Sequence, residues 1–197
     1  VATGGVDCGT GIAPMMEAAR LIALSGAKPK RTILFVGFAG EEFGLLGAKA
    51  FCERHKDKLG KIANLFNRDG GPTPPVGISV PKAMYDDFVE ICKPIKEINP
   101  EYPFEVTVAQ PRKKPTTMGG TDASVFAVKG VPTYGFREQD FKGYNFNYGE
   151  IWHTERDLYT KSIPEYMEHT SVVTAIVALG VANLKHQLSR EGMYTDQ

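Results

Sequence analysis

The chain has 197 residues, which is long enough for one sizeable α/β domain, and we expect a single domain over residues 1–197. Its 23 Lys and Arg residues balance 23 Asp and Glu residues, so the net charge of zero gives no basic bias toward nucleic acid. The three widely spaced cysteines exclude a disulfide framework, and the longest apolar run near the C-terminus, 172–182, is too short to span a bilayer.

The first stretch, 1–11, has neither a Met start nor a signal peptide, and we expect that a preceding segment is missing. Four glycines within residues 4–11 predict a loop with unusual backbone angles around Asp7. A helix is expected over 12–24. The almost wholly apolar run 32–38 then predicts a strand buried on both faces, as in parallel sheets, and it leads to the adjacent acids Glu41 and Glu42.

The rest of the chain alternates between helical and strand patterns. The expected helices are 45–55, 82–98, 123–128 and 164–189, and the expected strands are 62–69, 76–80, 104–109 and 131–136. Pro94 is expected to kink or shorten its helix. A long aromatic loop, 137–157, contains His153. This order of elements predicts a three-layer α/β/α sandwich with a mostly parallel central sheet.

Carboxylates follow two of the expected strands at their C-terminal ends. Neighbouring like charges repel, so the pair Glu41 and Glu42 needs either solvent or a nearby cation. One interpretation is that the two acids merely begin the next helix, whose dipole favours them. The other is a metal site. The same pattern recurs at Asp69 and favours the metal site, because sites in such sheets form beyond the carboxyl ends of the strands.

Four residues form the candidate ligand set: Asp7, Glu42, Asp69 and His153. Carboxylate oxygens together with an imidazole suit zinc, or manganese or cobalt in its place. Glu41, next to a ligand, would then be the general base that takes a proton from metal-bound water. The other histidines are interpreted as surface or structural residues: His55, His169 and His186.

Several stretches taken together resemble the co-catalytic zinc aminopeptidases, a family of zinc exopeptidases. These stretches are residues 5–11, 31–48, 67–70, 120–122 with 130–132, and 152–154 with Asp157. The resemblance covers nearly the whole chain, and within the family it is strongest to the plasma glutamate carboxypeptidase (carboxypeptidase Q) branch. The ordered set of an acid loop, Glu-Glu, Asp-Gly and a late His is specific, although each piece alone would be weak.

The resemblance implies a role for each matched residue. Asp7 would bridge two zinc ions, while Glu42 and Asp69 would each bind one of them. His153 would bind the ion opposite one of these acids, and Glu41 would act as general base and acid. These roles imply the zinc-exopeptidase fold and hydrolysis of terminal peptide bonds in peptides or dipeptides.

Three more residues would lie beside the ligands and the substrate pocket: Asp122, Thr121 and Cys8. The peptide bond between Asp7 and Cys8 is expected to be cis. Cys8 and Thr10 depart from the family, which commonly has Asn or Asp and then Ser or Gly there. The family's first histidine ligand belongs to a His-x-Asp motif upstream of the bridging acid, where this chain has no residues. Two zinc ions, one ion or an empty site therefore remain as alternatives.

The absent histidine also leaves alternatives for the function. One is a catalytically inactive, peptidase-like binding domain, which a His-x-Asp motif encoded upstream would exclude. The other is a glutaminyl cyclase, because similar folds perform that reaction with one zinc ion held by Asp, Glu and His. The resemblance implies a secreted protein, periplasmic or extracellular, with a peptide as its substrate. It is also compatible with a homodimer.

Overall fold

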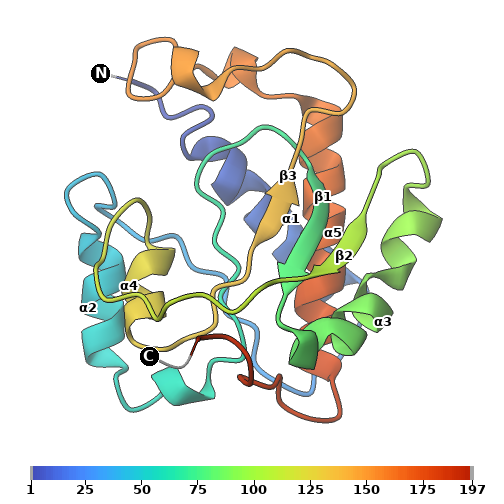
Figure 1. Cartoon of the computed structure of the whole chain (residues 1–197). Coiled ribbons are helices and arrows are strands. Elements are labelled where there is room, and N and C mark those ends of the chain that lie inside the picture. Colours follow the sequence, from blue (N-terminus) through green and yellow to red (C-terminus); the bar gives the residue numbers. More distant parts are fainter. Residues whose placement is uncertain (1, 196–197) are drawn as a thin grey trace.

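The computed structural model describes residues 2–195, and helices dominate it (Figure 1). The α-helices are α1 (Gly9–Leu24), α2 (Leu46–Arg54), α3 (Lys82–Ile98), α4 (Ala123–Val128) and α5 (Pro164–Asn183). The strands are β1 (Pro75–Val80), β2 (Glu105–Val108) and β3 (Phe136–Glu138), and short 3-10 helices are η1 (Leu59–Lys61), η2 (Tyr148–Glu150) and η3 (Tyr159–Lys161). The single-domain prediction also includes Val1, Asp196 and Gln197, which lie outside the described residues. Within 2–195, no helix combines the length and apolar character that crossing a membrane requires.

The strands form a small mixed sheet in the order β2-β1-β3. β1 pairs in parallel with β2, from Gly77 opposite Glu105 to Val80 opposite Val108. It pairs antiparallel with β3, with an irregularity between Pro75 and Gly77. The predicted α/β class is confirmed, but the prediction of a mostly parallel sheet is wrong for the described strands, because one of the two pairings is antiparallel.

The two expected strands that precede the acids, 32–38 and 62–69, are not paired as strands in this sheet. Segment 62–69 runs beside 131–136, where the Leu65 amide donates to the Pro132 carbonyl at 2.8 Å. A side chain makes the next link: the Asn64 amide group donates to the Tyr134 carbonyl at 2.9 Å and accepts from the Tyr134 amide at 3.0 Å. Pro132 has no amide hydrogen to donate in return, so regular pairing stops here and β3 begins only at Phe136.

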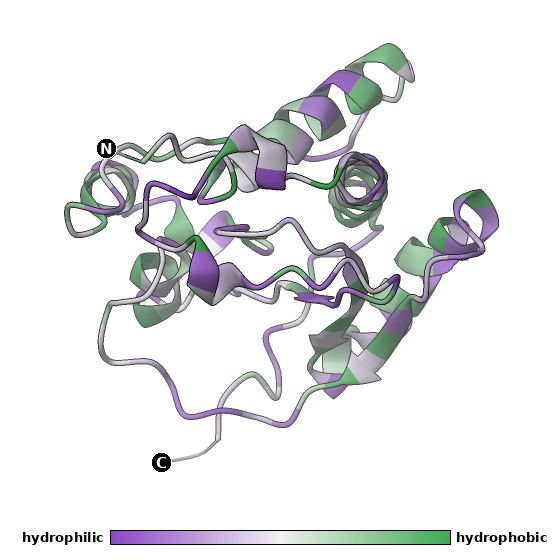
Figure 2. Ribbon diagram, turned by 90° about the horizontal axis from the view of Figure 1, so that it is seen from above, coloured by the Kyte–Doolittle hydropathy of each residue, from purple (hydrophilic) through white to green (hydrophobic). Residues whose placement is uncertain are grey.

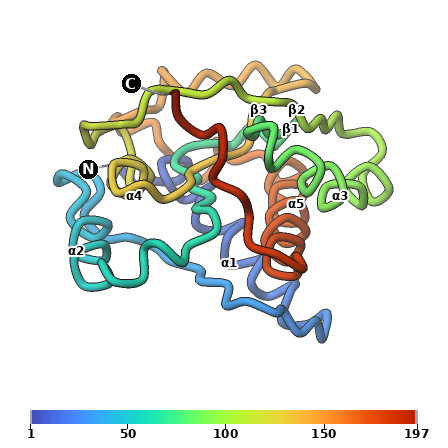
Figure 3. The backbone as a smooth tube through the Cα atoms, turned by 60° about the horizontal axis from the view of Figure 1, so that its bottom comes forward, coloured from blue at the N-terminus to red at the C-terminus, as the bar shows by residue number. Residues whose placement is uncertain are grey.

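These two segments nevertheless lie between two groups of helices, as Figures 1 and 3 show. Ile33 and Phe35 pack against the cluster between α1 and α5, whereas Phe38 packs against the cluster of α2 and α4. In the same way Phe66 packs against the α3–α5 core and Leu65 against the α2–α4 cluster. Side chains that alternate between two faces are the property of an extended chain. The predicted three-layer arrangement is therefore confirmed, with a central layer that is irregular.

The expected burial of 32–38 on both faces is wrong. Leu34 is 65% exposed, and every residue of this segment is either exposed or half-buried. Residues of both faces pack on helices, but part of the segment still meets solvent.

The ends of α3 and α5 test two of the expected helices. α3 spans the expected residues and continues to Ile98, so Pro94 does not shorten it. Pro94 is exposed, so water can satisfy the carbonyl that loses its helical partner. α5 ends at Asn183 rather than at 189. Beyond it the chain turns so that Leu188 and Met193 enter the main core, and this burial favours ending the helix.

The main core lies between α3, α5 and β1. Its largest fully buried side chains include Met84, Phe88 and Ile95 on α3, with Ile78 on β1. The helices carry both hydrophobic and hydrophilic residues, as expected of elements with one face toward a core (Figure 2). This core includes buried residues from the C-terminal half of α5.

His169 on α5 is a buried histidine with two polar contacts, which agrees with its interpretation as a structural residue. Its Nδ1 lies 2.8 Å from the Asn99 side-chain amide and its Nε2 lies 3.3 Å from the Pro75 carbonyl. Its ring stacks on Tyr102 with a centroid distance of 3.9 Å. Burial lowers the pKa of His169 to about 4, and the contact with Pro75 only partly opposes this effect.

Folding stability should therefore fall as the pH drops from the ordinary histidine pKa of 6.5 to about 4. In that window the unfolded chain binds a proton at this position and the folded chain does not, so protons favour unfolding. We expect a loss of about 3 kcal/mol, measured by urea unfolding at a series of pH values. His169→Gln should remove this part of the pH dependence, whereas His186→Gln, at an exposed histidine, should retain it. An unchanged pH dependence in His169→Gln would contradict the assignment.

Candidate metal centre

Asp7 lies in the turn that enters α1, and the peptide bond that follows it is cis, as the resemblance implied. Two glycines bring this turn into direct contact with other backbones. A Cβ atom on Gly5 would lie 2.3 Å from the Leu158 carbonyl carbon, and one on Gly11 would lie 2.5 Å from the Arg68 carbonyl oxygen. Only residues without a Cβ atom permit these approaches. The Asp7 turn is thereby packed against the segments that precede Asp69 and follow His153.

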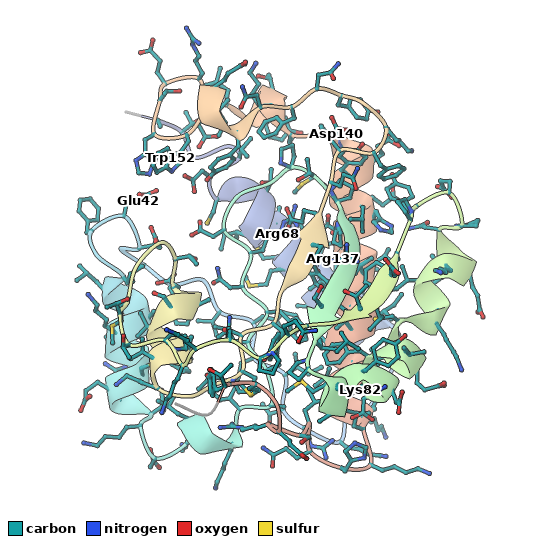
Figure 4. The ribbon with its side chains drawn as sticks, in the orientation of Figure 1. Glu42, Arg68, Lys82, Arg137, Asp140 and Trp152 are labelled. Carbon is teal, nitrogen blue, oxygen red and sulfur yellow. The ribbon has the colours of Figure 1, made fainter. Side chains whose placement is uncertain are left out.

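Asp7, Glu42 and His153 converge on one another. One ligand atom from each lies within 4.8 Å of the others, and His153 Nε2 is 3.0 Å from the Glu42 carboxylate. In Figure 4, Glu42 lies on the same side of the molecule as Trp152, the neighbour of His153. Two carboxylates and one imidazole form a set of three protein ligands of the kind found in catalytic zinc sites. The side chains present therefore fit a zinc ion.

The backbone of the 137–157 loop sets the direction of His153. His153 has φ of 56°, in the left-handed region that is uncommon for residues other than glycine. The next residue is fixed by two contacts with the Ile151 carbonyl, one from the Thr154 amide and one from the Thr154 hydroxyl, both at 2.9 Å. The tight turn after Ile151 thus holds the imidazole toward Glu42.

Asp69 lies next to this cluster without belonging to it. It is close enough to contribute to the raised pKa of both Asp7 and Glu41. Burial is the largest cause of the raised pKa at both positions, and repulsion from the neighbouring carboxylates adds to it. The structure therefore brings three of the four predicted ligands together and places the fourth within their electrostatic reach.

Glu41 is a half-buried carboxylate beside the cluster. Burial raises its pKa, and Asp69 and Glu42 raise it further. A carboxylate with a raised pKa accepts a proton more readily, which moves it toward the range in which a general base is effective near neutral pH. The direction of this shift agrees with the predicted role of Glu41 as a base, which stays a prediction.

The three residues predicted beside the pocket also border the acids. Asp122 is 7% exposed, one of its oxygens has no hydrogen-bond partner, and burial and Asp69 raise its pKa. The Thr121 hydroxyl accepts a hydrogen bond of 2.7 Å from the Asn67 side chain. Burial and nearby carboxylates raise the pKa of the Cys8 thiol to about 11, which keeps it protonated at neutral pH.

Arg68 connects three segments around the candidate metal centre. Its side chain donates to the Thr10 carbonyl at 3.1 Å and to the Thr73 carbonyl at 2.9 Å, and it forms an ion pair with Glu138 of β3. In Figure 4 Arg68 lies between α1 and β3. One guanidinium therefore joins the start of α1, the loop after Asp69 and the edge of the sheet.

Sequence reasoning assigned no role to Arg68 or to two further residues of this site, Asp157 and Tyr148. The Asp157 carboxylate accepts hydrogen bonds from the backbone amides of Val6 and Asp7. The ring of Tyr148 lies over Gly70, where a Cβ atom would be 3.1 Å from a ring carbon. Asp157 belongs to the last stretch of sequence that resembles the zinc aminopeptidases, and this pointed to a role for it. Nothing in the sequence distinguishes Tyr148 from the other aromatic residues of its loop.

Comparison with known proteins places these residues in a family of peptidases. The model of the family described as Peptidase family M28 matches residues 1–177. Carboxypeptidase Q from Mus musculus is 30% identical over 190 residues, which cover 96% of this chain and 37% of the mouse protein. The chain therefore spans well under half the length of this relative.

Solved structures with the same fold are also peptidases. A peptidase M28 precursor from Shewanella amazonensis has a TM-score of 0.75 and 28% identity, and the match covers 95% of this chain and 40% of that one. The zinc aminopeptidase BSAP from Bacillus subtilis has a TM-score of 0.65 and 19% identity over 98% of this chain and 46% of its own, a likeness of fold alone. These structures confirm the expected zinc-exopeptidase fold. Because the family model covers most of the sequence, the chain belongs to peptidase family M28.

Proposed function

We propose that the protein is a zinc-dependent exopeptidase that hydrolyses terminal peptide bonds of peptides or dipeptides. The observation that carries this proposal is the convergence of Asp7, Glu42 and His153 in a chain of a peptidase family. The names of its relatives, a carboxypeptidase and an aminopeptidase, support hydrolysis. They do not favour the two alternatives, an inactive binding domain or a glutaminyl cyclase.

Each residue of the centre has a task in this reaction. Asp7, Glu42 and His153 would hold one zinc ion, and Asp7 with Asp69 would contribute to a second. Bound zinc would polarise the scissile carbonyl and lower the pKa of the attacking water. Glu41 would take a proton from the attacking water and return it to the leaving amine.

Three neighbouring residues would shape the pocket: Asp122, Thr121 and Cys8. The buried, unpartnered oxygen of Asp122 supports a role toward a polar group of the substrate or the ligands. Cys8 would serve as a neutral thiol that packs beside the acids, because its raised pKa makes a thiolate unfavourable.

Location and assembly form a separate part of the proposal. The resemblance supports a periplasmic or extracellular enzyme, and a homodimer stays a prediction. All three thiols, Cys8, Cys52 and Cys92, are free in the structure, so no disulfide bond adds support for an oxidising compartment.

Dipeptide hydrolysis by the longest natural polypeptide that contains this chain tests the reaction. We expect hydrolysis that a chelator abolishes and that added zinc restores, because zinc is needed to activate water. A peptide with an N-terminal glutamine should release free amino acids. Formation of pyroglutamate, or no hydrolysis by zinc-loaded protein, would contradict the proposal.

A further inference from the structure

Asp157 is a buried acid in the loop that carries His153. It is 2% exposed, and none of the ion pairs among residues 2–195 involves it. Burying a carboxylate is costly unless strong donors satisfy its oxygens. Its surroundings must therefore supply those donors, and they come from the opposite end of the chain.

The donors are consecutive backbone amides of the turn that contains Asp7. One carboxylate oxygen of Asp157 accepts from the Val6 amide at 2.6 Å, and the other accepts from the Asp7 amide at 3.1 Å. The Asp157 carbonyl also accepts from the Gly5 amide at 3.3 Å and from the Thr3 hydroxyl at 2.6 Å. A single residue thus fixes the backbone of residues 3–7.

The contact requires a carboxylate in particular. Both oxygens of Asp157 accept, one from each amide, and only an ionised carboxylate offers two acceptor atoms in this shape. An asparagine would keep one acceptor and turn an NH2 group toward the second amide. That group cannot accept, so one backbone donor would be left unsatisfied.

Asp157 thereby connects two of the three residues in the candidate metal cluster. Asp7 and Asp157 are 150 positions apart in the sequence. On the other side, the Asp157 amide donates to the Thr154 carbonyl at 3.2 Å, and Thr154 directly follows His153. Asp157 therefore holds the turn of Asp7 and the turn of His153 in a fixed position relative to each other.

We propose that Asp157 is a positioning residue, which presets the Asp7 carboxylate relative to His153 so that both can bind the same zinc ion. This inference rests on the proposed role of Asp7 as a ligand. Asp157 does not touch the ion itself. It acts by fixing the backbone of Asp7 and thereby the direction of the Asp7 side chain. Residues that hydrogen-bond to metal ligands orient those ligands in a similar way.

Asp157→Asn tests the inference through zinc affinity, measured by competition with a chelator at a temperature where the variant is folded. We expect zinc affinity to fall about 10–100-fold, which is the typical effect of removing a residue that supports a metal ligand. Asp140→Asn is the matched control. The Asp140 carboxylate also accepts from loop amides, those of Gly143, Tyr144 and Asn145, but none of its contacts involves the cluster. Its variant should bind zinc like the wild type.

A second measurement needs no variant and no zinc. Hydrogen exchange in the metal-free wild-type chain should show protection of the Val6 and Asp7 amides, because Asp157 binds both. Exchange of these two amides as fast as in an open loop would overturn the inference, even if Asp157→Asn failed to fold.

The outcomes separate this inference from the proposed function. If the wild type binds zinc and Asp157→Asn binds it equally well, the positioning role is wrong and the metal centre stands. If the wild type binds no zinc, the metal centre itself is wrong. A fall in zinc affinity shared by Asp140→Asn would also overturn the inference, because the effect would then be a general result of loosening a loop.

Discussion

Replacing Glu41 with Gln is expected to lower the turnover of a dipeptide about 1,000-fold while the protein keeps its zinc. The amide of glutamine cannot accept a proton from water, and general-base catalysis typically contributes about 10²–10⁴-fold. Glu41 lies beside the cluster of Asp7, Glu42 and His153 and is not among its three members. The measurement is kcat together with zinc content, in the longest natural polypeptide that contains this chain.

Glu155→Gln is the control for this experiment. Glu155 is an exposed acid of the 137–157 loop, so its variant should keep both turnover and zinc. Normal hydrolysis by Glu41→Gln would show that the wrong residue has been assigned as the base. Loss of zinc from Glu41→Gln would instead show that Glu41 binds the metal.

Replacing His153 with Ala is expected to weaken zinc binding by more than about 100-fold. Loss of a residue that only supports a metal ligand costs up to about 100-fold, and loss of a ligand should cost more. His153 is the only nitrogen ligand in the cluster with Asp7 and Glu42. Without it the ion would have two carboxylates, which offer poorer selectivity for zinc. Isothermal titration or chelator competition with zinc alone measures the change.

The chain offers a matched control for this variant in His186. His186 Nε2 lies 2.9 Å from the Asp87 carboxylate, and His153 Nε2 lies 3.0 Å from the Glu42 carboxylate. Both are exposed histidines next to one acid, but only His153 has a second acid within ligand distance. His186→Ala should therefore leave zinc affinity unchanged. An equal loss in both variants would mean that zinc binds nonspecifically to histidine–carboxylate pairs.

The residues of the candidate centre were more predictable than the strands that carry them. Glu41, Glu42 and Asp69 follow apolar runs. Acids in such positions indicate a site whether or not the run is hydrogen-bonded as a strand. The pairing itself depends on neighbours far away in sequence. The pairing of 62–69 is interrupted by Pro132 and by the side chain of Asn64, and local patterns do not reveal such events.

The supporting contacts were the least predictable part of the site. A buried acid such as Asp157 has the same local sequence signature as an exposed one, and its partners lie 150 positions away. Arg68 likewise looks like a solvated cation next to Asp69, yet it reaches the carbonyl oxygens of Thr10 and Thr73. The three-dimensional packing of the glycine-rich turn decides these contacts.

A crystal structure of the chain grown with zinc, with the ion located by anomalous scattering, tests the central claim most directly. We expect an anomalous peak about 2.0–2.2 Å from a nitrogen of His153 and from carboxylate oxygens of Glu42 and Asp7. A zinc ion found only elsewhere on the chain, for example between His186 and Asp87, would contradict the account.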